Sequence, residues 1–249
     1  MIAFNPYSLE GKTILVTGAS SGIGKVTAVL CSKMGAHVVI TGRNVERLQE
    51  TFQELEGDEH QQIIAELTNE EDLKRLVEEV PLLDGFVNNA GIGSKTPINF
   101  IKQSALQNIL DVNTIAPIML TKMLLKKKKL QKGASMVLTS SISGVCSVDI
   151  GNTLYSVTKS AIDGFMKNAA KELAEKGIRV NSVNPGMVDT PINDYSNVSE
   201  EQIQADLLRY PLKRHGKPEE IAYAIIYLLS DAAAWVTGTA LKIDGGYSL

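Results

Sequence analysis

The residues with the clearest chemical potential are Tyr155 and Lys159, a tyrosine and a lysine four positions apart. On a helix this spacing places both side chains on one face, one turn apart. An ammonium beside a phenol favours the phenolate, so we expect Lys159 to lower the pKa of Tyr155 from its usual value of about 10. A tyrosine tuned in this way can donate or accept a proton near neutral pH. The pair therefore predicts a site of proton transfer.

A glycine-rich turn lies upstream of this pair, where residues 17–24 read TGASSGIG. An apolar run precedes the turn and a helical pattern follows it. Glycines at such a place let backbone N–H groups approach a pyrophosphate at a helix N-terminus, where the helix dipole favours negative charge. The turn therefore predicts dinucleotide binding through Gly18, Gly22 and Gly24, although a plain strand-to-helix turn would show the same pattern.

The end of the next apolar run indicates which dinucleotide is bound. A site for NAD usually carries Asp or Glu about 20 residues after the glycines, on the ribose 2′-hydroxyl. Gly42 occupies that place in this chain, and Arg43 follows it. A missing carboxylate beside a guanidinium suits a 2′-phosphate, so we expect NADP (NADPH), with NAD as the less favoured cofactor. A solvated loop arginine is the simpler alternative.

Polar and small residues stand at three further places that a dinucleotide and its substrate could reach. Residues 88–91 read NNAG after a strand-like run, where asparagines can bond neighbouring strands and the small residues admit a ribose; a simple turn is the alternative. Asn113 stands in the middle of a helical pattern despite its poor helix propensity, although it could be a plain surface residue. Ser140 and Ser141 end another apolar run.

Seven short apolar runs alternate with longer helical patterns, as in a parallel sheet that is covered on both faces. We expect one domain, residues 1–249, with an α/β, three-layer, doubly wound fold and a seven-stranded, mostly parallel sheet. The expected strands are Thr13–Thr17, His37–Thr41, Ile63–Ala65, Gly85–Val87, Ser135–Thr139, Arg179–Val183 and Leu241–Ile243. The expected helices are Ile23–Met34, Val45–Glu54, Glu70–Val80, Ile101–Lys129, Thr153–Lys176 and Pro218–Ser230, with Gly35, Gly133 and Gly177 at the ends of three of them.

Composition narrows the class of protein. The chain is 44% hydrophobic and 21% charged, with a net charge of −3, so no basic face for nucleic acid is expected. We also expect no signal peptide and no membrane span, because no apolar run approaches the roughly 18 residues that a span needs. Cys31 and Cys146 do not form a disulfide framework, which favours the cytoplasm, and the three histidines show no metal-ligand spacing.

In this order the motifs resemble the compact single-domain branch of the short-chain dehydrogenase/reductase family. The resemblance extends from TGASSGIG, with its GxxxGxG spacing, through NNAG, YSVTK and NPGMVDT to the closing GTALKIDGG. It implies a Rossmann fold and a catalytic tetrad at Asn113, Ser141, Tyr155 and Lys159. Tyr155 would be the acid/base and Ser141 would hold the substrate oxygen. Lys159 would lower the tyrosine pKa and bind the nicotinamide ribose, and Asn113 would position a water.

The same resemblance implies the cofactor contacts. Ser20 and Arg43 would meet the 2′-phosphate, Asn88 and Gly91 the ribose, and Thr190 with the backbone of Val188 the carboxamide. The full set is Gly18, Ser20, Ser21, Gly22, Ile23, Gly24, Arg43, Leu67, Asn89, Ala90, Gly91, Tyr155, Lys159, Pro185, Gly186, Val188 and Thr190.

The chain departs from the family pattern at two places. Glu66-Leu67 stands where the family has an aspartate that bonds adenine, so only the lining role of Leu67 is carried over. The interval between Ser141 and Tyr155 is one residue longer than expected, which leaves Ser140 and Ser143 as alternatives for the substrate-binding serine. Ser141 is preferred because it precedes Gly144 by three residues, as in the family.

These observations predict NADPH-dependent reduction of a ketone or oxoacyl carbonyl. The alternatives are an NAD-dependent alcohol, hydroxysteroid or sugar dehydrogenase and a non-catalytic dinucleotide-binding regulator. Residues 189–216, with a helical pattern near Glu200–Arg209, are expected to cover the substrate. The C-terminal part resembles 3-oxoacyl-carrier-protein reductases, so Lys126–Lys129 and Lys176 could receive a carrier protein, although a solvated helix end is the simpler interpretation. The resemblance also implies a homotetramer or homodimer.

Overall fold

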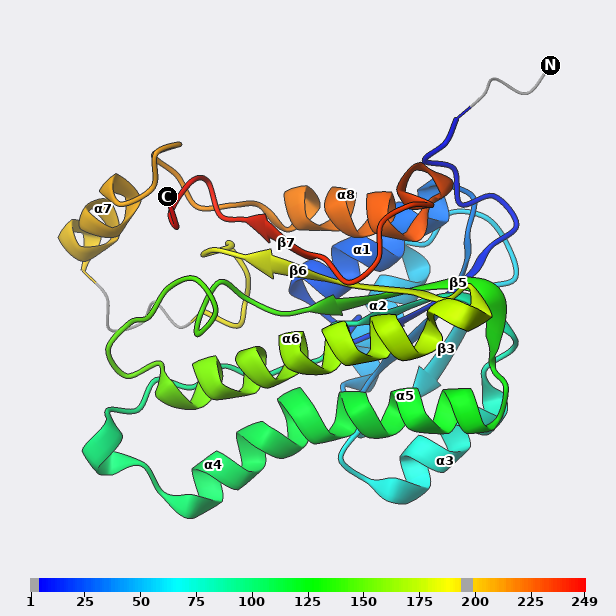
Figure 1. Cartoon of the computed structure of the whole chain (residues 1–249), viewed down its shortest axis with the longest axis horizontal. Helices are drawn as coiled ribbons and strands as arrows, with labels where there is room; N and C mark the ends of the chain where they lie inside the picture. The colour runs from blue at the N-terminus through cyan, green and yellow to red at the C-terminus, as the bar shows by residue number, and fades with distance from the viewer. Residues whose placement is uncertain (1–4, 194–198) are drawn as a thin grey trace.

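A seven-stranded sheet forms the centre of the molecule (Figure 1). The computed structural model describes residues 5–193 and 199–249. Its strands are β1 (Thr13–Thr17), β2 (His37–Gly42), β3 (Gln61–Ile64), β4 (Leu83–Asn88), β5 (Leu130–Thr139), β6 (Arg179–Pro185) and β7 (Ala240–Ile243). The strand order is β3-β2-β1-β4-β5-β6-β7, and all neighbouring pairs are parallel. The predicted doubly wound α/β fold is confirmed.

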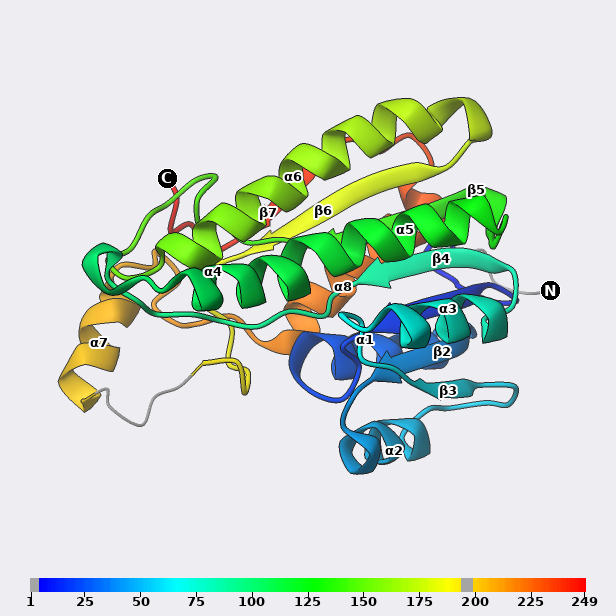
Figure 2. The same ribbon diagram turned by 90° about the horizontal axis from the view of Figure 1, so that it is seen from below.

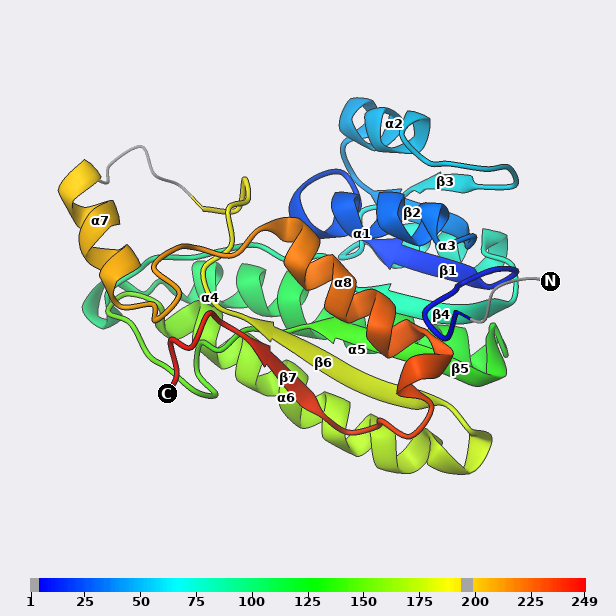
Figure 3. The same cartoon turned by 90° about the horizontal axis from the view of Figure 1, so that it is seen from above.

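Helices cover both faces of the sheet. They are α1 (Gly22–Lys33), α2 (Val45–Gln53), α3 (Glu70–Glu79), α4 (Gln103–Leu110), α5 (Ala116–Lys126), α6 (Thr153–Leu173), α7 (Glu200–Leu208) and α8 (Pro218–Leu229). Helices α3, α4, α5 and α6 lie on one face, which Figure 2 shows from below. Helices α1, α2 and α8 lie on the other face, seen from above in Figure 3, whereas α7 stands beyond one end of the sheet.

The apolar runs are continuous because each strand buries both of its faces. In β1, Leu15 packs into the core under α3, α5 and α6, whereas Ile14 and Val16 pack into the core under α1 and α8. Successive side chains of a strand point to opposite faces, so both sets must be apolar when both faces are covered.

The helix predicted over Ile101–Lys129 is wrong in its bounds and its continuity. A short 3₁₀ turn, Ile98–Phe100, precedes α4, and a π-helical turn, Asp111–Ile115, separates α4 from α5. The helix ends at Lys126 because Lys128 adopts a left-handed conformation, with φ of 54°. Strand β5 therefore begins at Leu130, well before the predicted Ser135, and Gly133 lies in the strand rather than at a helix end.

The order of the strands reverses direction between β1 and β4. The chain moves outward from β1 to β3, returns to the other side of β1 with β4, and continues to β7. In such sheets ligands bind beyond the carboxyl ends of the strands at this switch point. The carboxyl ends point toward α7, and the N-terminus lies at the opposite edge (Figure 1).

Leu120 provides a test of the core beneath α5. The side chain is 0% exposed, so Leu120→Ala is expected to lower the free energy of unfolding by about 2–5 kcal/mol through lost burial and a residual cavity. Denaturant titration measures this change. The same substitution at Leu208, which is 69% exposed on α7, should change the free energy of unfolding by less than about 0.5 kcal/mol. Equal effects at the two positions would contradict this placement of the core.

Candidate active site

The glycine-rich turn forms a backbone cradle between β1 and α1. Gly18 has φ of +64°, and a Cβ built on it would lie 2.8 Å from the Cα of Ala90. A Cβ on Gly24 would overlap the Gly18 carbonyl oxygen and the Asn89 amide. Helix α1 has no side-chain cap and no acidic residue in its first turn. Its first N–H groups are therefore not neutralised by a side chain, as an anion-binding helix N-terminus requires.

The NNAG segment is tied to this cradle across the switch point. Thr17 Oγ1 accepts hydrogen bonds from the backbone N–H groups of Asn89 at 3.0 Å and Ala90 at 3.1 Å. Asn89 Nδ2 donates in return to the carbonyl oxygens of Thr17 at 3.2 Å and Gly18 at 3.4 Å. The Asn89 side chain thus holds the turn in shape.

The residues predicted for a 2′-phosphate gather at the end of β2. The Arg43 side chain is 68% exposed, and its Nη1 lies 3.3 Å from Glu66 Oε2. Ser20 lies against Gly42, since a Cβ built on that glycine would be 3.5 Å from Ser20 Oγ. Leu67 is only 8% exposed and packs into the core near α3, so its main contacts are structural. The guanidinium available to a phosphate is therefore shared with a carboxylate.

Helix α6 carries Tyr155 and Lys159 on one face, as their spacing predicts. The Lys159 Nζ lies 5.5 Å from the centre of the tyrosine ring. This side chain is 4% exposed, and its ammonium donates to the Thr139 carbonyl oxygen at the end of β5 over 2.7 Å. A Cβ built on Gly91 would be 3.6 Å from the same Nζ. The lysine thus lies where the carboxyl ends of β4 and β5 meet α6.

Burial alters the acidity of both groups. It raises the pKa of Tyr155 to about 12, although the hydrogen-bond interaction with Ser141 acts in the opposite direction. It lowers the pKa of Lys159 to about 8, against the electrostatic effect of Asp163. The prediction that Lys159 lowers the pKa of Tyr155 below its usual value is wrong, because burial raises it. The ammonium is bonded to Thr139 and its charge does not outweigh the desolvation of the phenol.

The three candidate serines have different partners. Ser140 Oγ donates to the Lys159 carbonyl oxygen at 3.0 Å, and Ser143 Oγ accepts from Asn152 Nδ2 at 2.9 Å. Ser141 is the serine whose hydroxyl interacts with Tyr155. It also accepts from the Ser143 N–H at 3.1 Å. The geometry thus favours Ser141 as the partner of the tyrosine.

Asn113 lies in the π-helical turn between α4 and α5. Such turns are rare and occur frequently at functional sites. The side chain is 2% exposed; its Oδ1 accepts from the Ile92 N–H at 2.8 Å and its Nδ2 donates to the Ile92 carbonyl at 2.9 Å and to Thr158 Oγ1 at 3.2 Å. The amide therefore ties the segment after β4 to α6. Its predicted role with a water remains a prediction.

The segment after β6 returns to the glycine cradle. Thr190 lies beside Gly22, because a Cβ built on the glycine would be 3.4 Å from the threonine Cβ. Val188 is 5% exposed, and its carbonyl accepts from Thr190 Oγ1 at 3.3 Å. The Pro185 carbonyl accepts from the Ile142 N–H at 3.1 Å, and the Gly186 N–H donates to the Ile243 carbonyl at 3.0 Å.

The described part of the predicted covering segment is anchored to its surroundings. Helix α7 confirms the helical pattern predicted near Glu200–Arg209. Arg209 binds Asp149 of the segment between β5 and α6 at 3.1 Å and stacks on the Tyr247 ring at 4.6 Å. His215 Nε2 lies 3.0 Å from Asp206 Oδ2. Residues 194–198 of this segment lie outside the described residues.

Two residues of this site escaped the sequence interpretation. The carbonyl of Thr139 receives the Lys159 ammonium, a contact that only the fold creates. Asp163 is a 4% exposed carboxylate that stands one helical turn after Lys159. The sequence did carry a signal for Asp163: it is a carboxylate four residues after Lys159 and eight after Tyr155, and therefore on the same face of the helix.

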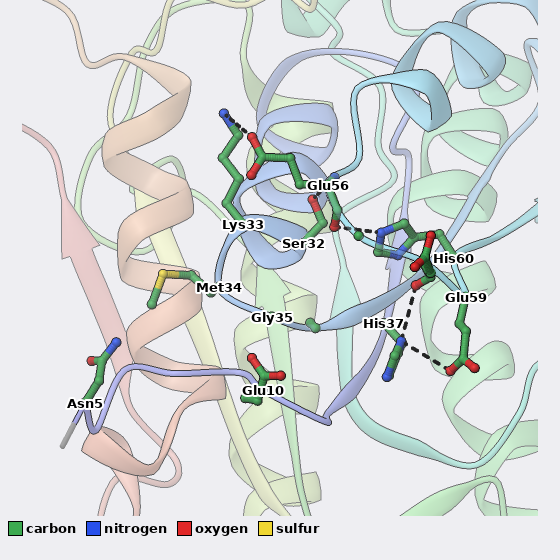
Figure 4. Close-up of a pocket in the computed structure, with 13 residues that line it drawn as sticks. Asn5, Glu10, Ser32, Lys33, Met34, Gly35, His37, Glu56, Glu59 and His60 are labelled. Atoms are coloured by element: carbon green, nitrogen blue, oxygen red, sulfur yellow. Dashed lines mark hydrogen bonds and ion pairs between the residues drawn. The ribbon is translucent and has the colours of Figure 1, made fainter. Parts of the chain in front are cut away.

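A hollow of about 690 Å³ lies at the opposite edge of the sheet, where α1 leads into β2 and α2 into β3 (Figure 4). Its polar groups bind one another: Lys33 lies 3.4 Å from Glu56, and His60 bonds to the Glu56 carbonyl and the Val38 N–H.

Among residues 5–193 and 199–249, no group of three or more His, Cys, Asp or Glu side chains is placed to hold a metal ion. None of the described helices has the length and apolar character to cross a membrane.

The residues at the carboxyl edge fit a dinucleotide. The uncapped N-terminus of α1 faces the backbone cradle, and Arg43 exposes a guanidinium at the end of β2. Asn88 Nδ2 and Thr139 Oγ1 are buried polar atoms with no partner among the described residues. Buried polar atoms without partners are rare, and these two lie where β4 and β5 end, beside the cradle.

Comparison with known proteins agrees with this arrangement. A family model described as enoyl-(acyl carrier protein) reductase matches residues 18–248. The 3-oxoacyl-(acyl-carrier-protein) reductase FabG of Rickettsia felis is 36% identical over 238 residues, covering 96% of this chain and 97% of that protein. The enzyme of the same name from Thermotoga maritima is 36% identical over 244 residues, covering 96% and 98%.

Solved structures show the same likeness. A putative betaketoacyl-ACP reductase superposes with a TM-score of 0.86 at 32% identity, covering 97% of this chain and 100% of that one. A putative gluconate dehydrogenase from Agrobacterium tumefaciens superposes with a TM-score of 0.90 at 28% identity, covering 98% of both chains. The chain is an oxidoreductase acting on CH–OH groups with an NAD(P) cofactor, and it belongs to the short-chain dehydrogenase/reductase family.

Proposed function

We propose that this protein reduces a ketone or oxoacyl carbonyl to a secondary alcohol with NADPH. The observation that carries the proposal is the meeting of Tyr155, Ser141 and Lys159 beside the glycine cradle. Tyr155 keeps its proton across the physiological range, because burial raises its pKa to about 12. A protonated phenol is the form that donates to a carbonyl oxygen, so the site is prepared for reduction.

In this proposal Ser141 and Tyr155 act on the oxygen of the substrate carbonyl, and Lys159 acts on Tyr155. The reduced nicotinamide supplies a hydride to the carbonyl carbon when it is bound. The Ser141 hydroxyl hydrogen-bonds the substrate oxygen as negative charge develops there, and Tyr155 donates its phenolic proton to the same oxygen. The Lys159 ammonium stabilises the phenolate that remains. Gly18, Gly22, Gly24, Gly91 and Thr190 would hold the dinucleotide.

The preference for NADPH rests on the end of β2. Gly42 offers no carboxylate to a ribose 2′-hydroxyl, and Arg43 offers an exposed guanidinium. Such a pair suits a 2′-phosphate better than a 2′-hydroxyl. Glu66 moderates this preference, because its carboxylate pairs with Arg43 and would repel a phosphate. Because Gly42 lacks a carboxylate and Arg43 is still exposed, an NAD-dependent alcohol, hydroxysteroid or sugar dehydrogenase is the weaker proposal.

The names of the relatives support an oxoacyl thioester as substrate. The lysines that could receive a carrier protein give weaker support, because they lie far from Tyr155. Lys126 ends α5, Lys127–Lys129 follow it, and Lys176 ends the 3₁₀ turn after α6, so these lysines lie at the amino edge of the sheet. Lys176 is about 30 Å along α6 from Tyr155, at 1.5 Å of rise per residue. The proposed substrate therefore includes a free ketone or thioester as well as one bound to a carrier protein.

We also propose self-association as a homotetramer or homodimer, through α4, α5, α6 and β7. The support is the resemblance to the family, together with exposed apolar side chains on or near these elements, such as Ile115 and Trp235.

A cytoplasmic location is proposed because both cysteines, Cys31 and Cys146, are free.

Tyr155→Phe tests the proposal directly. Loss of the phenolic proton should lower turnover by about a hundredfold or more, since a positioned general acid contributes about 10²–10⁴-fold. Dinucleotide affinity, measured by fluorescence titration, should change little. Tyr223→Phe, at a 59% exposed position on α8, is the matched control and should keep full turnover. Near-full activity of Tyr155→Phe would remove the tyrosine from the mechanism.

The pH dependence of reduction tests the role of Lys159. A lysine is charged below its pKa, so the pKa of about 8 means that Lys159 is charged at neutral pH and neutral above about pH 8. The rate of reduction should therefore fall as pH rises through about 8. Lys159→Arg keeps the charge, and its alkaline limb should lie at higher pH. A wild-type rate that stays constant across this range would contradict the role.

Arg43→Gln tests the choice of cofactor. Removing the guanidinium should weaken NADPH binding by about tenfold or more and leave NADH binding nearly unchanged, because only NADPH carries the 2′-phosphate. Glu66→Gln should act in the opposite direction, since it frees Arg43 from its ion pair. Fluorescence titration with both cofactors measures the ratio of affinities. Equal weakening of both cofactors by Arg43→Gln would show that Arg43 does not select between them.

A further inference from the structure

Asp163 is a buried carboxylate in phase with the two central residues of α6. Tyr155, Lys159 and Asp163 follow one another at intervals of four residues, so they lie on the same face of the helix. Asp163 is 4% exposed. Aspartate is almost never buried to this degree unless it is paired, because an unpaired buried charge is costly. The role of Asp163 therefore follows from the groups that donate hydrogen bonds to its carboxylate.

Both carboxylate oxygens accept hydrogen bonds from β6. Ser182 Oγ lies 2.7 Å from Asp163 Oδ1, and Asn184 Nδ2 donates to Asp163 Oδ2 at 2.6 Å. Ser182 and Asn184 are both 0% exposed. Asn184 Nδ2 also donates to the carbonyl oxygen of Ser141 at 3.0 Å. A chain of buried hydrogen bonds thus joins Asp163 to the backbone of the serine that faces Tyr155.

Asp163 also acts on Lys159. No ion pair within 4.0 Å joins them among the described residues, but Asp163 stands one helical turn after Lys159 on the same face of α6, where its charge raises the pKa of the ammonium against the effect of burial. The other neighbours of Lys159 are neutral: the Thr139 carbonyl, Gly91, Asn113 beside Gly91, and the protonated Tyr155. Among the described residues, Asp163 is therefore the acidic group whose charge reaches Lys159.

We propose that Asp163 is a positioning residue of the active site, which holds Ser141 in place through Asn184 and keeps Lys159 charged at neutral pH. The first effect is geometric and passes through β6. The second effect is electrostatic and passes along α6. The proposal deepens the proposed function and rests on it, because both effects serve the proton donation assigned to Tyr155.

The two effects can be separated by substitution. Asp163→Asn keeps the shape of the side chain and removes its charge, so the midpoint of the alkaline limb should move down by about one pH unit. Turnover at pH 8 should fall by about fivefold, because about nine-tenths of Lys159 would then be neutral, compared with about half in the wild type. Ser182→Ala removes the contacts of this hydroxyl with Asp163 and Asn184 but keeps the charge of Asp163, and it is the control whose alkaline limb should stay in place. NADPH affinity should be similar in both variants.

A second readout needs no substrate. In protein labelled with ¹³C at lysine Cε, the chemical shift of Lys159 reports its titration, and Lys159→Arg identifies the resonance. Asp163→Asn should lower the titration midpoint, whereas Ser182→Ala should leave it unchanged. An unchanged midpoint in Asp163→Asn would overturn the electrostatic part of the proposal. This result is independent of turnover, so a wild-type protein that reduces no carbonyl would refute the proposed function and leave the test of Asp163 intact.

Asp163→Glu covers the case in which Asp163→Asn fails to fold. The glutamate keeps the charge and displaces the carboxylate from Asn184, so the titration of Lys159 should stay near its wild-type midpoint while turnover falls. Full turnover in Asp163→Glu would overturn the geometric part of the proposal. A midpoint that falls in this variant would overturn the electrostatic part, because the charge is retained.

Discussion

The hydrogen bond from the buried Lys159 ammonium to the Thr139 carbonyl is the interaction on which the site depends. A 4% exposed ammonium has no carboxylate within 4.0 Å among the described residues, so backbone oxygen takes the place of water around it. That requirement fixes the start of α6 against the carboxyl end of β5. Ser140 reinforces the contact by donating to the Lys159 carbonyl. Tyr155, one turn earlier on α6, is thereby held beside Ser141.

The parallel sheet explains why residues distant in the sequence meet at this point. Every strand ends at the same edge, so the turns after β1, β2, β4, β5 and β6 form one surface. Thr17 joins the first and third of these turns through its hydroxyl, and Thr190 reaches back to Gly22. A dinucleotide laid along this edge would span from Arg43 at one end to Lys159 at the other. The order of the strands would thus set the order of the proposed cofactor contacts.

Local signals in the sequence were enough to predict the fold and several residues that the structure brings together at the carboxyl edge of the sheet. Continuous apolar runs marked the strands, because Ile14 and Leu15 are buried on opposite faces of β1. Glycine spacing and the Tyr155–Lys159 interval marked the cradle and the pair. Periodicity does not reveal a shift in hydrogen bonding within a helical pattern, so the π turn at Asn113 was missed. The left-handed Lys128 was missed for a similar reason, since lysine has no preference for that conformation.

Properties that arise from packing were beyond the sequence. The pKa of Tyr155 depends on how far the phenol is removed from water, which spacing does not reveal. The pairing of Arg43 with Glu66 depends on the distance between β2 and the turn after β3. The role of Asp163 depends on Asn184, a residue of the neighbouring strand.

The most direct test of the account is the oxidation of NADPH and of NADH by the wild-type protein, followed by absorbance, against a panel of carbonyls. The panel contains an acetoacetyl thioester, a keto sugar, a steroid ketone and a simple diketone. The account predicts turnover of at least one carbonyl, faster with NADPH than with NADH at equal concentration. Tight binding of the dinucleotide without turnover of any carbonyl by either cofactor would contradict it and would favour a binding protein over a reductase.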